Sequence, residues 1–92
     1  MATFNATISN SKKTVIGNVR LYTGTYTVPS NATVNDNIRF TTGFNNLIYY
    51  DLCHNNTYGA ISYSTESEGS RTNLLVTGLA GNATGKFIII GT

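Results

Sequence analysis

The stretch that decides the fold runs from residue 14 to residue 28 and reads Thr14-Val15-Ile16-Gly17-Asn18-Val19-Arg20-Leu21-Tyr22-Thr23-Gly24-Thr25-Tyr26-Thr27-Val28. β-Branched and aromatic residues dominate it, and these residue types favour strands. Val15, Val19 and Leu21 fall in one alternation phase, whereas Tyr22, Tyr26 and Val28 fall in the opposite phase. Because successive side chains of a strand point to opposite faces, such a change of phase requires an inserted residue. The stretch therefore predicts one long β segment with a bulge or bend near residues 22–24.

The rest of the chain continues this pattern, since no window shows apolar residues at helical spacing. Segments with strand character are separated by turn residues such as Gly, Asn and Pro. Besides residues 14–28, the expected strands lie within residues 2–8, 38–41, 47–53, 58–64, 74–76 and 86–90. The glycine-rich residues 78–85 lead into a β-branched run, so they are expected to connect strands rather than bind phosphate. We predict an all-β fold, a single small antiparallel β-sandwich or barrel with six to seven strands.

Two of these segments are apolar in both alternation phases. Residues 47–53 are expected to be buried on both faces, with Cys53 as a small buried residue. Residues 87–90, Phe-Ile-Ile-Ile, are expected to form a strand that is central or covered by an interface.

The N-terminus has the pattern of a separate β arm. Phe4 and Ile8 share one face with small apolar residues, and polar residues occupy the other face. Asn10 and Ser11 then interrupt the run, so we predict an arm over residues 1–13 and a β domain over residues 14–92. An isolated terminal strand gains little on its own. The arm is therefore expected to pair with the sheet edge of another subunit through Phe4 and Ile8.

The composition argues against an enzyme. The chain has six Lys and Arg, four Asp and Glu, one His and one Cys, and active sites need clustered ionisable groups. Asp51, Cys53 and His54 form the nearest approach to a nucleophile with its base. Neighbouring strand residues point apart, however, and a carboxylate beside a thiol raises the pKa of that thiol. We expect no catalytic residues, no metal site and no cofactor.

The net charge of +2 is small and scattered, and no basic stripe is interleaved with aromatic residues, so nucleic-acid binding is not expected. Membrane insertion is not expected either, because no apolar run reaches the length of a membrane helix. The first residues lack the pattern of a secretory signal, which predicts synthesis in a cytoplasm. Tyr49 and Tyr50 lie on opposite faces of one strand, so one ring can contact a partner while the other joins the core.

Residues 13–27 combine an apolar pair, Gly17-Asn18, Arg20, a short β run and Gly24, and residues 86–92 end in Phe-Ile-Ile-Ile-Gly-Thr. Both ends of the chain resemble the opening and the closing strand of small structural proteins of tailed phages. The resemblance implies a virion component, namely a β-sandwich of the capsid decoration (cement) type. Such a protein would form homo-oligomers, expected to be trimers, and would bind the assembled major capsid protein. The partner-binding residues expected here are Phe4, Ile8, Tyr49 and Tyr50. The alternative is a tail- or fibre-associated β-sandwich that binds a host glycan or receptor.

Overall fold

The computed structural model describes residues 2–54 and 60–92, apart from the side chain of His54. These residues form an all-β fold without helices, as predicted from the sequence. There are eight strands rather than six to seven: β1 (Thr3–Asn5), β2 (Thr7–Ile16), β3 (Val19–Thr27), β4 (Asn37–Phe44), β5 (Leu47–His54), β6 (Ser62–Glu68), β7 (Arg71–Thr77) and β8 (Thr84–Gly91). The predicted number of strands was too low mainly because residues 14–28 were expected to form one segment, whereas they belong to two strands.

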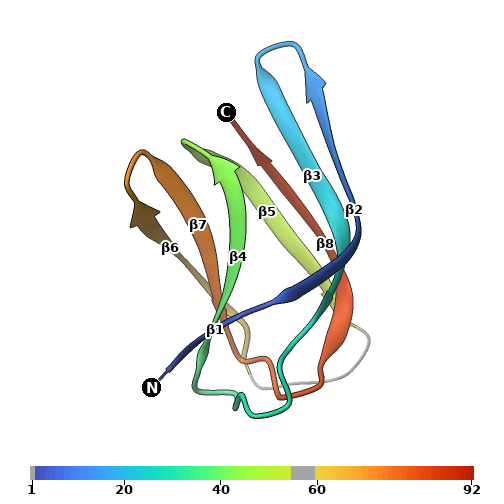
Figure 1. Ribbon diagram of the computed structural model, residues 1–92, viewed down its shortest axis with the longest axis vertical. Coiled ribbons are helices and arrows are strands. Elements are labelled where there is room, and N and C mark those ends of the chain that lie inside the picture. The colour runs from blue at the N-terminus through green and yellow to red at the C-terminus, as the bar shows by residue number, and fades with distance from the viewer. Residues whose placement is uncertain (1, 55–59) are drawn as a thin grey trace.

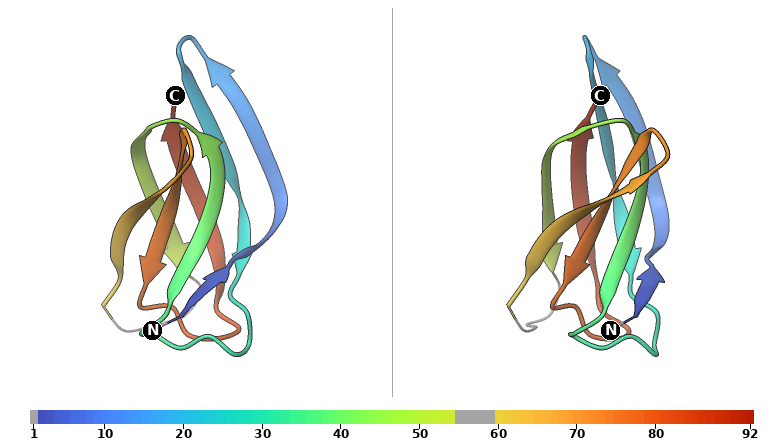
Figure 2. Two further views of the ribbon diagram at one scale, coloured as in Figure 1. Left: turned by 60° about the vertical axis from the view of Figure 1, so that its left-hand side comes forward. Right: turned by 90° about the vertical axis from the view of Figure 1, so that its left-hand side faces the viewer.

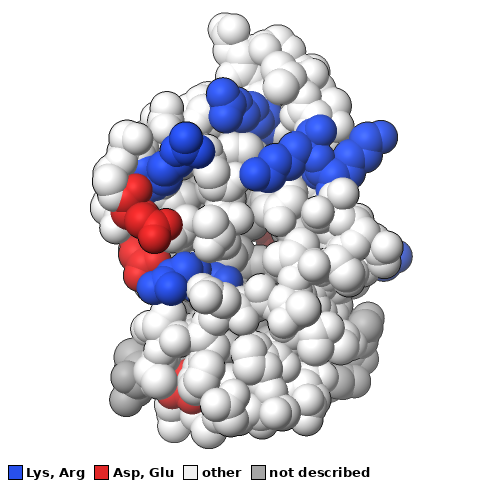
Figure 3. Space-filling model, in the orientation of Figure 1, with Lys and Arg blue, Asp and Glu red and all other residues white. Residues whose placement is uncertain are grey.

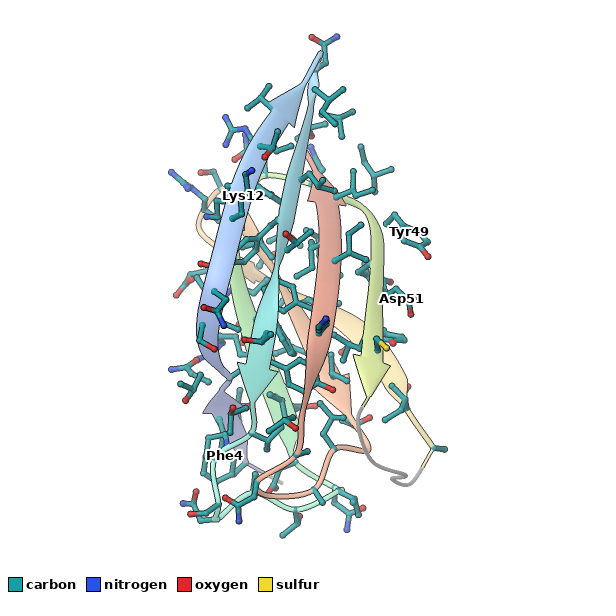
Figure 4. The ribbon with its side chains drawn as sticks, turned by 90° about the vertical axis from the view of Figure 1, so that its right-hand side faces the viewer. Phe4, Lys12, Tyr49 and Asp51 are labelled. Carbon is teal, nitrogen blue, oxygen red and sulfur yellow. The ribbon has the colours of Figure 1, made fainter. Side chains whose placement is uncertain are left out.

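The strands form two four-stranded sheets, in the orders β1-β4-β7-β6 and β2-β3-β8-β5. The short strand β1 pairs in parallel with β4, and every other described pairing is antiparallel. The β1-β4-β7-β6 sheet lies to the left of the other sheet in Figure 1 and in front of it in Figure 2, and the strands run roughly along the 37 Å long axis. The outer face of the β2-β3-β8-β5 sheet is seen in Figure 4.

Aromatic side chains from both sheets meet in the core, which contains no tryptophan. The Phe40 ring of β4 packs edge to face on Tyr26 of β3 and on Phe87 of β8, with centroid distances of 5.4 and 5.5 Å. Tyr22 packs on Phe87 at 4.9 Å in the same way. Edge-to-face pairs place the positive rim of one ring on the negative face of another. These contacts join the inner faces of the two sheets.

Strand β8 is central, as predicted, because it pairs with both β3 and β5. Phe87 and Ile89 point into the core and are almost completely buried, whereas Ile88 and Ile90 lie half-buried on the outer face. The prediction that residues 47–53 are buried on both faces is wrong. Strand β5 is an edge strand whose outer face is open, and Cys53 is exposed.

Gly17 and Asn18 divide the long β segment into the hairpin β2–β3. Gly17 has a φ of +61°, which a glycine adopts without steric cost. The irregularity predicted near residues 22–24 lies instead in the neighbouring strand. The register of β2 shifts between Ser9 and Lys12, opposite Gly24, and Asn10 has a φ of +51°. The hairpin projects along the long axis, at the top of Figure 1.

The prediction of a separate N-terminal arm is wrong in its boundary and its pairing. Residues 3–5 pair with β4 of the same chain, and the chain then crosses to the other sheet, where Thr7 lies opposite Thr27. Ala6 N donates a hydrogen bond to Arg39 O at the crossing. Strand β2 continues to Ile16, so the proposed boundary at residue 13 falls inside a strand. Residues 3–16 thus supply one edge strand to each sheet of their own chain.

Candidate partner interface

The candidate catalytic residues do not form a site in the described structure. Asp51 and Cys53 are both exposed on the outer face of β5, as their shared alternation phase predicted. The side chain of His54 and the first two residues of the strand expected at 58–64 lie outside the part of the chain that the structure describes. No group of three or more His, Cys, Asp or Glu within the described residues could hold a metal ion.

The four predicted partner-binding residues do not lie together. Phe4 and Ile8 are half-buried against the core of their own chain, and Phe4 lies at the opposite end of the molecule from Tyr49 (Figure 4). Tyr50 packs against the core, and its ring lies 5.3 Å from that of Tyr63. Tyr49 is 51% exposed. The prediction that one of the two tyrosines reaches the surface is confirmed.

The exposed apolar side chains gather at the end of the molecule that carries the β2–β3 turn, which we call the hairpin end. Among the described residues, four of the five large exposed hydrophobic side chains lie there: Val15 (67% exposed), Ile16 (65%), Ile48 (58%) and Tyr49 (51%). The strand register joins several of them across the outer face, since Ile16 lies opposite Val19, and Ile90 lies between Leu21 and Tyr49. Together they form an apolar strip: Ile16, Val19, Leu21, Ile48, Tyr49 and Ile90. Exposed apolar surface of this kind is typical of interaction sites.

Most of the positive charge lies in the same half of the molecule. Lys and Arg side chains gather in the upper part of Figure 3, around the base of the hairpin. Lys13 and Arg20 share the inner face of the hairpin with Val15, because Lys13 pairs with Tyr22 and Val15 pairs with Arg20. Arg71, at the start of β7, donates from Nη1 to Gly43 O at 2.8 Å.

Three of the four carboxylates are engaged elsewhere. Glu66 accepts hydrogen bonds from Arg39 at 2.7 and 2.9 Å, the one ion pair among the described residues, and this contact lowers the pKa of Glu66. Glu68 accepts from the buried amide of Asn73 at 3.1 Å. Asp36 accepts from the main chain of Ala2 and Thr33, which lowers the pKa of Asp36. The cations of the hairpin end are thus left without a carboxylate partner in the described structure.

A second surface feature is a shallow depression on the β2-β3-β8-β5 sheet, beside the irregularity in β2. It is lined by Asn10, Thr23, Gly24, Thr25, Lys86 and Phe87. A Cβ on Gly24 would lie 3.1 Å from the Phe87 ring, so the glycine lets that buried ring pack closely against β3. The side chains of Asn10, Thr23, Thr25 and Lys86 bring amide, hydroxyl and ammonium groups to the depression.

Comparisons of the chain with protein-family models, curated proteins and solved structures give no match. None of the described residues belongs to a helix long and apolar enough to cross a membrane. Function is therefore inferred from the chain's own surface.

Sequence reasoning missed the hairpin end as a site, although a signal for it was present. A Gly-Asn pair between two β-branched runs is a recognised hairpin signal. The pair Val15-Ile16 before that turn and Val19 after it are the apolar residues that the turn carries to the hairpin end. No pattern in the sequence predicts that Arg71 lies near Lys13, because the two residues belong to different sheets.

Proposed function

We propose that this chain is a non-enzymatic assembly protein that binds a protein partner through its hairpin end. The observation that carries the proposal is the co-location of exposed aliphatic and aromatic side chains with unpaired cations at that end. An apolar centre supplies affinity at an interface, and charges around it supply orientation and specificity. A catalytic role has no comparable support, since the ionisable residues are few and dispersed.

The resemblance of residues 13–27 and 86–92 to tailed-phage structural proteins makes the proposal specific. In this proposal the two sheets form a β-sandwich, and the protein is a virion component of the capsid decoration type that binds the assembled major capsid protein. Homo-oligomers, with trimers as the expected state, would form through the apolar strip, because Phe4 and Ile8 are engaged in their own chain.

The experiment is to measure the copy number of this protein in purified virions on a quantified gel. Hundreds of copies per particle would support a capsid component, and tens or fewer would place it in the tail or fibre. Recombinant protein is then mixed with capsids that lack it, and co-sedimentation is compared between the native chain and Ile16→Ser. Absence of the protein from virions would refute the proposal.

The alternative is a tail- or fibre-associated protein that binds a host glycan, and two observations favour it. Tyr49 exposes half of its surface, and the depression beside Gly24 offers the hydroxyl groups of Thr23 and Thr25 and the amide of Asn10. Aromatic rings and polar side chains are the groups that bind sugars. Binding on a glycan array that is lost in Tyr49→Ala or Thr23→Ala would support this alternative.

A further inference from the structure

Gly43 marks a small space between two cationic nitrogens from different sheets. It lies near the end of β4 with a φ of +75°. A Cβ built there would lie 3.4 Å from Lys13 Nζ and 3.4 Å from Arg71 Nη1, with no other contact within 4 Å beyond the neighbouring residues. Because the residue is glycine, no side chain occupies this position.

Contacts within the fold hold both cations in place. Lys13 Nζ donates to Thr42 O at 2.9 Å and lies 4.8 Å from the centre of the Tyr22 ring. Arg71 Nη1 donates to Gly43 O. Each cation is thus oriented by a neutral carbonyl, which leaves its charge uncompensated. Two like charges held close together raise the energy of the site until an anion binds between them.

The inner face of the hairpin extends this site with a third cation and an aliphatic side chain. The Arg20 side chain makes no hydrogen bond or ion pair with any described residue, and Arg20 lies opposite Val15 in the hairpin register. Glu68 lies opposite Arg71, but its carboxylate accepts from Asn73 instead. Cations next to Val15, which is 67% exposed, match a ligand with both negative and apolar groups.

We propose that the inner face of the β2–β3 hairpin binds an acidic segment of the partner protein, with one carboxylate held by Lys13 and Arg71 above Gly43. A second carboxylate would contact Arg20, and an aliphatic side chain would cover Val15. A nucleic acid fits less well, because its backbone needs a longer row of cations and has no apolar group for Val15. The inference rests on the proposed function, since it names the chemistry of the protein partner.

The test measures fluorescence anisotropy of a labelled peptide of alternating Glu and Leu, added to the intact protein at low ionic strength. The expected result is saturable binding that weakens with salt and is lost when Gln replaces Glu in the peptide. The double variant Lys13→Gln, Arg71→Gln should bind about tenfold more weakly. Lys86→Gln, which removes one positive charge from the outer face of β8, should leave the affinity unchanged.

A second variant separates binding from folding. Arg20→Gln removes a side chain without a described partner, so it should keep the native melting temperature and still weaken peptide binding. Equal loss of affinity in Lys86→Gln would show a general charge effect and overturn the proposal. Tighter binding of an oligothymidine of equal charge, or no peptide binding, would also overturn it. If the Lys13 and Arg71 variant binds no peptide yet co-sediments normally with capsids, the proposed function stands and the partner binds elsewhere.

Discussion

Lys13 of β2 joins the two sheets by donating a hydrogen bond from its Nζ to the main-chain oxygen of Thr42 in β4, over 2.9 Å. Its ammonium group also lies over the rings of Tyr22 and Phe44, at 4.8 and 5.8 Å from their centres. The neighbouring Lys12 points to the outer face, where it lies opposite Thr23. Adjacent lysines therefore have different roles, which substitutions can separate.

Replacing Lys13 by Ala should lower the free energy of unfolding by about 1–2 kcal/mol, because a hydrogen bond and a cation–π contact are both lost. Lys12→Ala is the control and should change it by less than about 0.5 kcal/mol. Urea titration followed by tyrosine fluorescence measures both values. Equal effects of the two substitutions would contradict the inter-sheet role of Lys13.

Ile89→Ala should lower the free energy of unfolding by about 2–5 kcal/mol, because Ile89 is completely buried in a central strand and its truncation leaves a cavity. The matched control is Ile16→Ala, which truncates an isoleucine that is 65% exposed at the hairpin end. The control should leave monomer stability nearly unchanged. A cost below about 0.5 kcal/mol for Ile89→Ala would show that β8 is peripheral.

Deleting residues 2–10 should destabilise or unfold the domain, because these residues pair with β4 and β3 of their own chain. Phe4→Ala alone should lower the free energy of unfolding by about 1–3 kcal/mol. This is less than the effect of truncating a fully buried phenylalanine, because Phe4 is half-buried. Thr3→Ala, at an exposed position of the same strand, is the control. Circular dichroism and thermal melting measure the effects. A truncated chain with native stability would restore the hypothesis of a free arm.

Acid should weaken the fold through Asp36 and Glu66. Hydrogen bonds in the folded state lower the pKa values of both groups from ordinary values of 3.8 and 4.5. A group whose pKa is lowered by folding stabilises the fold fully at pH values above its ordinary pKa. This stabilisation is lost as the pH falls through the pKa that the group has in the folded state. The melting temperature should therefore be constant above about pH 5 and fall below about pH 4. Glu66→Gln should make the melting temperature fall less steeply with decreasing pH, whereas Glu68→Gln should change this dependence less.

Cys53 should react with a thiol reagent in the native protein at a rate close to that of a free thiol, because it is exposed on β5. Reaction only after denaturation would contradict this exposure. Cys53→Ser and His54→Ala should both leave the proposed capsid binding intact, since Asp51 and Cys53 are exposed and form no catalytic arrangement with other described residues. A folded variant that loses function would support an enzyme instead.

Local pattern determined the all-β class and the division of Tyr49 and Tyr50 between surface and core. These properties follow from alternation along a single strand, and each residue's own sequence neighbours contain that information. The sequence also contained the Gly17-Asn18 hairpin, although its flanking strands were interpreted as one segment.

Tertiary structure alone decided which strands lie at sheet edges. The apolar pattern of β5 resembles that of β8, yet β5 has one neighbour and β8 has two, so Cys53 is exposed and Ile89 is buried. It likewise decided that β1 and β2 are edge strands of different sheets in their own chain and that Lys13 and Arg71 flank Gly43. Alternation specifies which side chains share a face of one strand. Strand neighbours, and contacts between residues far apart in the chain, depend on how the whole chain packs.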